Sequence, residues 1–386
     1  MSKIKVNSLE GVGASTPAIS IDNASGTCTA NITNRSNRNK IINGGMTVSQ
    51  RQTSTTNSQA YVVDRFKAEV TQMDQLVQTL EQSSDAPDGF GKSIKITTTT
   101  PESSIASNEQ FRIQTKLEGQ DFQDLAYGTS AAKTITISFY VKASITGTFG
   151  FTVYREDSTD RVITAPYTIN SANTWERKTI TITGDTAGPA ITNDNTERFR
   201  LMWGLAAGAN FNTASASWSN YSSANLLGGH VTNDLVTTNN ATWQLTGVQL
   251  ELGSVATDFE HRSYGDELAL CQRYFYMHAS GAESSSTGAQ APIGLGYGYT
   301  SSDCYLVVKF PVTMRAYPST YKVVGTDYFA FYYNNNNAFP DNVANNRSAT
   351  NSAEIYFYGG SSWDQNAGGM VRVANSAARL GFNAEL

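Results

Sequence analysis

The side chains that most often carry out chemistry are few and scattered in this sequence. Its three histidines and three cysteines are His230, His261, His278, Cys28, Cys271 and Cys304. No histidine has the spacing of a metal ligand or of a catalytic base, and His230, after two glycines, is expected to be a solvated loop residue. The odd number and wide spacing of the cysteines fit neither a disulfide framework nor a zinc site. We therefore expect no catalytic residue, no metal site and no cofactor.

Aromatic rings among amides and hydroxyls indicate binding instead. The C–H bonds of a sugar stack on an aromatic face, while Asn, Asp and Gln bond to its hydroxyls. Two loop-rich stretches combine these types, and the candidate glycan- or receptor-binding residues are Trp218, Tyr221, Tyr332, Tyr333, Trp363 and Asp364. A core position is the competing interpretation for any one of these rings. Trp203 and Trp243, which lie inside apolar strands, are expected to be in the core.

The elements that must position these residues are predicted to be β-strands. Period-two alternation recurs along the chain, most clearly at 133–142, and turn residues separate the alternating stretches. Strands at this spacing indicate an antiparallel sandwich. Charged residues make up only 16% of the chain and the net charge is −5. That balance argues against nucleic-acid binding, and no apolar run is long enough to cross a membrane.

The stretch from Trp243 to Phe275 divides the chain. Residues 243–252 are predicted to form a strand with a bulge at Gly247, because the apolar alternation slips there. Ser263 is predicted to cap a short helix, with Asp266 three residues later. The apolar face expected of that helix consists of Leu268, Cys271 and Phe275. Three copies of the chain meeting along this face would bury it, and so would packing on either neighbouring domain.

Four segments follow from these patterns. We expect an extended N-terminal attachment arm at 1–40, a β-sandwich at 41–260, a linking helix at 261–276 and a C-terminal β domain at 277–386. The arm has no apolar block large enough for a core, so it is expected to be ordered by other chains or to remain loose. The N-terminus lacks the long apolar core of a signal peptide, which favours synthesis in a cytoplasm.

Several segments together resemble a module of tailed-bacteriophage fibre proteins, particularly those of marine phages and prophages. The resemblance covers roughly residues 41–276 and is carried by 42–51, 64–66, 136–143, 243–253, 256–260 and 268–275. These include Asn43-Gly44-Gly45-Met46, Asp64-Arg65-Phe66 and Cys271-Gln272-Arg273-Tyr274-Phe275. The part after about 280 is the variable end of such proteins.

The resemblance implies a jelly-roll sandwich similar to carbohydrate-binding modules. It also implies a virion appendage, usually a homotrimer, that joins other virion proteins through its N-terminal arm and meets a host glycan or protein with its far end. A structural calcium near Glu251 is a further implication of this shape. The expected protein is thus a fibre exposed on the virion and assembled in the host cytoplasm. The alternatives are a non-adhesive virion component, such as a head decoration or fibre adaptor, and, more distantly, a glycan-cleaving depolymerase.

Overall fold

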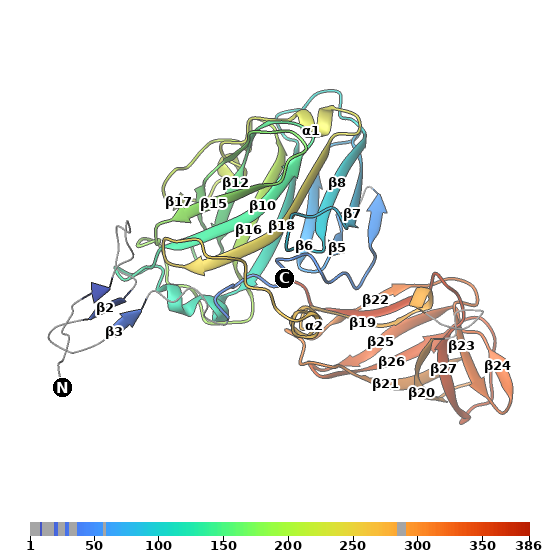
Figure 1. The fold of residues 1–386 in the computed structure, drawn as a ribbon. Helices are drawn as coiled ribbons and strands as arrows, with labels where there is room; N and C mark the ends of the chain where they lie inside the picture. The colour runs from blue at the N-terminus through green and yellow to red at the C-terminus, as the bar shows by residue number, and fades with distance from the viewer. Residues whose placement is uncertain (1–7, 10–18, 22–27, 31–36, 57–58, 284–290) are drawn as a thin grey trace.

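The computed structural model describes residues 8–9, 19–21, 28–30, 37–56, 59–283 and 291–386 (Figure 1). Of the expected arm at 1–40, it describes three short strands and residues 37–40. The remainder of that prediction lies outside the described residues. The three strands form one antiparallel sheet: β1 (Ser8–Leu9), β2 (Ile19–Ile21) and β3 (Cys28–Ala30).

Residues 54–252 form a sandwich of two antiparallel sheets. One sheet has six strands, in the order β15 (Glu176–Ile182), β10 (Ile135–Ala143), β18 (Thr242–Leu252), β8 (Ser93–Thr100), β7 (Val77–Ser83) and β4 (Ser54–Thr56). The other has seven, in the order β17 (Ser219–Asn220), β13 (Arg161–Thr164), β12 (Phe151–Arg155), β16 (Glu197–Ala207), β9 (Gln110–Glu118), β6 (Phe66–Thr71) and β5 (Tyr61–Val63). The remaining elements are the ribbon β11 (Gly147–Phe149) and β14 (Tyr167–Ile169), and the short helices η1 (Gly119–Leu125), η2 (Ser223–Asn225) and α1 (Asp234–Thr237). The predicted mainly β class and jelly-roll sandwich are confirmed.

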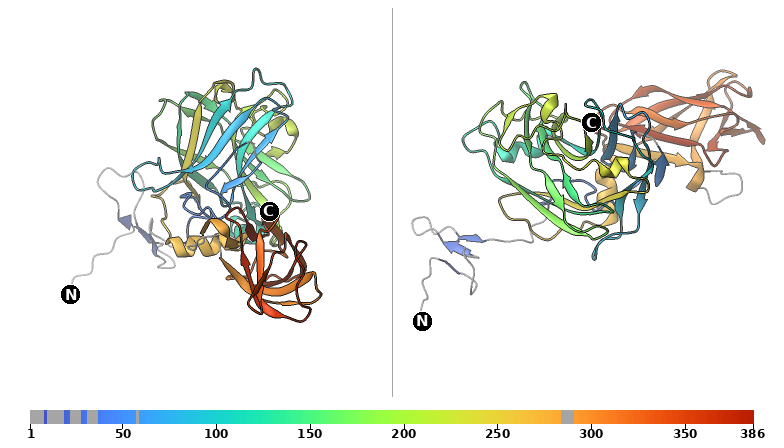
Figure 2. Two further views of the ribbon diagram at one scale, coloured as in Figure 1. Left: turned by 90° about the vertical axis from the view of Figure 1, so that its right-hand side faces the viewer. Right: turned by 90° about the horizontal axis from the view of Figure 1, so that it is seen from above.

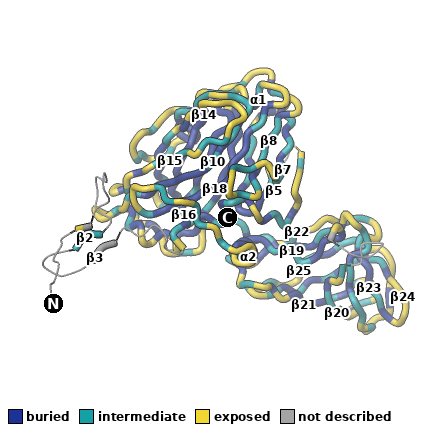
Figure 3. Tube along the Cα trace, viewed as in Figure 1, coloured by how far each residue is buried: buried dark blue, intermediate teal, exposed yellow. Residues whose placement is uncertain are grey.

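Aromatic side chains fill the space between the two sheets. Trp203 and Trp243 are both fully buried, as their apolar strands predict. The Trp203 ring lies 5.8 Å from Phe139 and 5.2 Å from Phe151, centroid to centroid and edge to face in both cases. The Trp243 indole N–H donates a hydrogen bond of 3.2 Å to the Tyr167 hydroxyl, so the buried donor is satisfied. Figure 3 shows the resulting band of buried strands.

The predicted bulge at Gly247 is confirmed. Along β10 and β18, Ser138 pairs with Gln249 and Tyr140 pairs with Thr246, so two residues of β18 lie opposite one residue of β10. Gly247 has a φ of +62°, a conformation in which glycine carries no steric penalty. The bulge therefore depends on glycine at position 247.

Residues 275–383 form a second β unit around a separate hydrophobic cluster, here called the C-terminal unit. Its three-stranded sheet has the order β19 (Phe275–Ser280), β28 (Arg379–Asn383) and β22 (Ser319–Val323). Its seven-stranded sheet has the order β24 (Asn336–Ala338), β23 (Phe329–Tyr333), β27 (Gly368–Val373), β20 (Pro292–Gly298), β21 (Asp303–Lys309), β26 (Ser352–Tyr358) and β25 (Asn342–Ser348), and η3 (Gly281–Glu283) follows β19. The unit lies beyond one end of the sandwich (Figures 1 and 2).

Helix α2 (Tyr264–Gln272) lies at the junction of the two units (Figure 1). It begins as predicted, because the Ser263 hydroxyl accepts a hydrogen bond of 3.2 Å from the Asp266 amide. The predicted trimer face, however, is wrong for two of its residues. Cys271 and Phe275 are fully buried within the chain, and Phe275 already belongs to β19. Packing on the neighbouring units, the alternative considered above, covers these side chains, and Leu268 is half-buried.

Within the described residues, no helix has the length and apolarity needed to cross a membrane.

Candidate functional site

Strand β20 has an inverted pattern of side-chain size. Its glycines face the core, since a Cβ on Gly296 would lie 2.9 Å from the Cys304 sulfur and one on Gly298 would lie 2.9 Å from Cδ1 of Trp363. Because side chains alternate between the two faces of a strand, the large residues Leu295 and Tyr297 point to solvent. Because this strand turns its small residues inward, its outer surface is apolar, and the described residues of the chain leave Leu295 and Tyr297 exposed there.

Tyrosines continue this surface across the neighbouring strands. Tyr297 on β20 pairs with Tyr305 on β21, which pairs with Tyr356 on β26. Ring centroids are 6.3 Å apart in the first pair and 5.3 Å apart in the second, where the rings are stacked at 17°. Tyr299 lies edge-on to Tyr305 at 5.3 Å, and Tyr358 stacks on Tyr356 at 5.3 Å. We call these five residues, together with Leu295 and Val307, the tyrosine face.

The tyrosine face is open to solvent. Leu295 is 83% exposed, Val307 60%, Tyr299 58% and Tyr297 51%. Large apolar side chains at such exposure on one continuous sheet surface are typical of an interaction site, whereas single exposed apolar residues are ordinary. The arrangement therefore marks this sheet as the candidate binding surface.

The hydroxyls of the tyrosine face are available to a ligand. Within the described residues, no hydrogen bond joins any of its five phenol groups to another part of the chain, whereas Tyr154 and Tyr274 donate to carboxylates at 2.6 Å. Removal from water and the nearby Asp303 carboxylate raise the pKa of Tyr305. Its hydroxyl is therefore protonated at neutral pH and can both donate and accept hydrogen bonds.

One of the residues predicted from the sequence lies on the same sheet surface. Tyr332 pairs with Met370, which pairs with Leu295, so a row of outward side chains leads from Tyr332 to the tyrosine face. The Tyr332 hydroxyl donates to Asn335 at 2.8 Å, and the Arg372 guanidinium lies 5.5 Å from its ring centroid. Asp364 is exposed and accepts a hydrogen bond of 3.3 Å from the Asn334 amide.

Two predicted residues of the C-terminal unit are core residues. Trp363 is 4% exposed and Tyr333 9%, and both belong to the hydrophobic cluster of this unit. Their rings pack on Phe331, with centroids at 5.7 Å and 5.2 Å. The expectation that they offer free rings in polar loops is therefore wrong. The polarity of a residue's neighbours in the sequence does not show which distant parts of the chain pack against that residue.

The two predicted residues of the sandwich pack against it. Trp218 lies edge-on to Tyr127 at 5.8 Å, and its indole N–H donates to the Thr183 carbonyl at 2.8 Å. Tyr221 lies edge-on to Tyr154 at 5.1 Å. Both are half-buried. The structure places them in a different unit from the tyrosine face, so the six candidates do not form one site.

His230 is buried rather than solvated. Only 2% of it is exposed, and its Nδ1 accepts a hydrogen bond of 3.1 Å from the Gly150 amide. Burial lowers the pKa of His230 to about 4. The glycines before it let the loop turn back into the sandwich, so the expectation of a solvated loop residue is wrong.

Glu251, near which the resemblance implies a structural calcium, is already paired with an arginine. A Glu251 oxygen lies 3.3 Å from Nε of Arg38, and the same Nε donates to the Thr257 hydroxyl at 2.8 Å. A guanidinium thus occupies the oxygen-lined position where a cation would bind, and these residues do not fit a calcium site. Among the described residues, no three His, Cys, Asp or Glu side chains are grouped so as to hold a metal.

Comparison with known proteins gives weak likenesses of fold. No family model and no curated protein matches the sequence. The enzymatically active domain of tailspike protein 4 of bacteriophage CBA120 matches with a TM-score of 0.31 at 10% identity, over 56% of this chain and only 22% of that one. A putative sugar binding protein from Bacteroides thetaiotaomicron matches with a TM-score of 0.31 at 10% identity, over 56% of this chain and all of the other. The family 11 carbohydrate-binding module of a Clostridium thermocellum cellulase gives 0.27 at 11% identity, over 54% and 99% of the two chains.

The tyrosine face was missed because its residues are far apart in the sequence. Tyr297, Tyr305 and Tyr356 come from three separate strands, and each alone reads as a core position. One local signal was present. Glycine alternates with Leu295, Tyr297 and Tyr299. Because alternate residues of a strand point to the same face, this pattern places the glycines on one face and the large side chains together on the other.

Proposed function

We propose that this chain is a surface-attachment protein of the tailed-phage fibre type, and that its C-terminal unit binds a host-surface glycan through the tyrosine face. The observation that carries the proposal is the open row of Tyr297, Tyr305 and Tyr356. Rigid aromatic residues supply large contact areas at small entropic cost, which suits a recognition surface. The resemblance of residues 41–276 to fibre modules supports the attachment role.

The phenol groups favour a glycan over a dry contact with another protein sheet. Five hydroxyls without a partner in the described chain would each need one if a flat apolar surface covered them. A glycan supplies hydroxyls at every ring, and its C–H groups pack against exposed aromatic rings and neighbouring apolar residues such as Val307. We propose that the protein binds this glycan without cleaving or otherwise modifying it.

Several copies acting together would strengthen the attachment. The proposed homotrimer would present three tyrosine faces, and the proposed arm contacts would hold it to other virion proteins. Repeated weak contacts gain avidity without a tight single site. A non-adhesive structural role is the second candidate, and the buried ion pairs that join the two units, described below, favour it because they hold the units in a fixed arrangement.

Replacing two tyrosines of the row tests the proposal. Full-length chain carrying Tyr297→Ala and Tyr356→Ala should lose about tenfold or more in affinity for the glycan it binds, because buried aromatic contacts dominate binding energy. The measurement is binding to a panel of neutral and acidic surface polysaccharides, followed by calorimetry on the best ligand.

The matched control removes two exposed tyrosines elsewhere. Tyr264 and Tyr317 are 60% and 76% exposed and lie outside the tyrosine face, so Tyr264→Ala with Tyr317→Ala should leave binding unchanged. Equal loss in both double variants, or no binding to any polysaccharide, contradicts the glycan proposal. Binding to host cells that protease treatment abolishes and periodate oxidation spares would assign a surface protein instead.

A further inference from the structure

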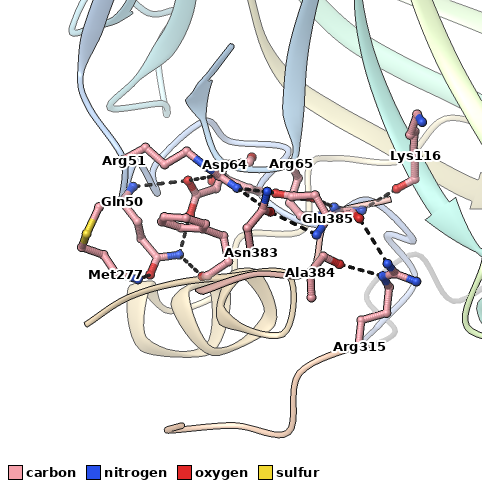
Figure 4. A network of polar contacts seen from close by, with 12 residues as sticks. Gln50, Arg51, Asp64, Arg65, Lys116, Met277, Arg315, Asn383, Ala384 and Glu385 are labelled. Carbon is pink, nitrogen blue, oxygen red and sulfur yellow. Dashed lines mark hydrogen bonds and ion pairs between the residues drawn. The ribbon is translucent and has the colours of Figure 1, made fainter. Parts of the chain in front are cut away.

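The sandwich and the C-terminal unit meet through buried charges (Figure 4). Asp64 and Arg65 belong to the sandwich, and Arg51 lies just before its first strand; the three residues are 1%, 2% and 8% exposed. Glu385 follows the last strand of the C-terminal unit, and its side chain is 5% exposed. One Glu385 oxygen pairs with Arg65, and the other lies 3.4 Å from Nη2 of Arg51. The carboxylate thus reaches both arginines of the other unit.

The arginines also stack on rings from the linking segment. The Arg65 guanidinium lies 3.4 Å from the Tyr274 ring centroid, and that of Arg51 lies 3.6 Å from the Phe275 centroid. Cations over aromatic faces are attracted to the ring electrons, more so when water is excluded. Arg51 and Arg65 are therefore held between the rings on one side and Glu385 on the other.

The charges on the sandwich side do not balance without the C-terminal unit. Nη1 of Arg51 lies 3.4 Å from Asp64, which is the partner that the sandwich itself provides. Of the other buried acids near the junction, Glu118 is paired with Arg273 at 2.8 Å and with the Tyr274 hydroxyl at 2.6 Å, and Glu267 lies 3.5 Å from Arg262. Two buried cations thus share one local carboxylate, and Glu385 supplies the second. Burial has the largest single effect and lowers the pKa of Arg65, but Glu385 together with Tyr274, Tyr61 and Cys271 raises that pKa overall.

A second contact fixes the segment that carries Glu385. Arg315 of the C-terminal unit donates to the Ala384 carbonyl at 2.7 Å and to the Glu385 carbonyl at 3.1 Å, while its Nη1 donates to the Asn195 carbonyl of the sandwich at 2.9 Å. The Ala384 amide donates to the Tyr274 carbonyl at 2.8 Å. The Glu385 side chain is therefore aimed into the sandwich by its own backbone contacts.

The segments that carry the fibre resemblance converge at this junction. Arg51 ends one of them, Asp64-Arg65 begins another, and Arg273, Tyr274 and Phe275 end a third. In the structure they contact one another where the two units meet, and Figure 4 shows Arg51, Asp64 and Arg65 at this place.

We propose that the end of the sandwich is a docking socket for a separately packed β unit, and that the socket recognises an acidic side chain placed just after that unit's last strand. A β unit that fits this socket has an Arg-Tyr-Phe segment at the start of its first strand, as in Arg273-Tyr274-Phe275. It also has a carboxylate after its last strand, as in Glu385. The inference does not depend on what the tyrosine face binds.

Removing the carboxylate in the full-length chain tests the socket. Glu385→Ala leaves the buried Arg65 without its partner, and opening of the junction should rise on the order of a hundredfold. Glu385→Gln should have a smaller effect, because its amide oxygen still accepts one hydrogen bond. The measurement is backbone hydrogen exchange, which should accelerate in peptides spanning 48–66 and 379–386.

The controls separate the socket from general damage. Exchange in β10 and β26 should stay slow, which reports that both cores are intact. Glu156→Ala removes the same group from an ion pair 3.7 Å from Arg200, in which the Glu156 side chain is 45% exposed, and should leave exchange at the junction unchanged. Arg315→Gln loosens the segment without removing the carboxylate and should accelerate the same peptides more weakly. Junction exchange in Glu385→Ala and Arg315→Gln equal to that of the unchanged chain would overturn the proposal.

Discussion

Single residues of the same type have opposite positions in this fold. Tyr333 packs into the C-terminal core, while Tyr297 is 51% exposed on the outer face. Tyr333 lies between an aromatic run and four asparagines, and Tyr297 lies among glycines, so mean hydropathy alone predicts the position of neither residue. Whether a tyrosine is buried depends on which side of its strand the opposite sheet covers. The strands that pair with it in the fold determine that side.

Buried His230 makes a prediction about pH. Burial lowers the pKa of His230 to about 4, so between about 6.5 and 4 the unfolded chain binds a proton there that the folded chain does not. Stability is therefore lost as the pH falls through this window, by about 3 kcal/mol for this group at most. Denaturant unfolding of the chain between pH 7 and pH 4 measures the slope.

His230→Asn isolates this contribution. Its side-chain oxygen can accept the Gly150 amide that Nδ1 accepts now, but it does not titrate. The variant should show a flatter loss of stability on acidification than the unchanged chain. Identical slopes would mean that His230 is not the group responsible.

At the scale of elements, local patterns predicted strands and the helix start well. Strand 133–142 is found as β10 (Ile135–Ala143), and Ser263 caps α2 as expected. Helix α2, however, ends at Gln272, so Phe275 is a strand residue and not part of a helical face. The ring contacts of Phe275 with Arg51, far away in the chain, decide its position, and helical spacing does not contain that information.

The bulge in β18 gives a prediction about stability. A Cβ at Gly247 would lie 2.8 Å from Cζ of Phe90 and 2.9 Å from Cδ2 of Tyr140, and its positive φ disfavours alanine. Gly247→Ala should therefore lower the free energy of unfolding by about 1–3 kcal/mol. Chemical denaturation monitored by tryptophan fluorescence measures the change.

Gly265→Ala is the matched control for this substitution. Gly265 lies in α2, where an added Cβ meets nothing within 4 Å, so alanine should be neutral or stabilising by up to about 1 kcal/mol. Equal effects at Gly247 and Gly265 would contradict the steric role assigned to the bulge.

At the scale of the molecule, the proposed binding surface and the junction of the two units are separate. The tyrosine face lies on the seven-stranded sheet of the C-terminal unit, and the socket holds that unit on the sandwich through Glu385 and two arginines. A firmly held unit loses little freedom on binding, which favours affinity. The segments that resemble fibre modules thus meet at the junction. The tyrosine face, which is the proposed glycan-binding surface, lies in the C-terminal unit, outside the resemblance.

The proposed multivalency predicts a difference between soluble and surface-bound ligand. The full-length chain should bind a dense polysaccharide surface roughly a hundredfold or more tighter than the same glycan as a short oligosaccharide. Surface binding assays and solution calorimetry measure the two affinities, and light scattering at micromolar concentration gives the number of copies. A monomer with equal affinities would contradict this part of the proposal.

Period-two alternation, turn residues, the Gly247 slip and the Ser263 cap determined the mainly β class, the sandwich and the helix start from sequence alone. Each of these depends on neighbours a few residues apart, which the sequence shows directly. The tyrosine face, the burial of Trp363 and the pairing of Glu385 with Arg65 were decided only by tertiary structure. In each case the decisive contact joins residues that are far apart in the sequence, and the order and register of the strands set which side chains meet.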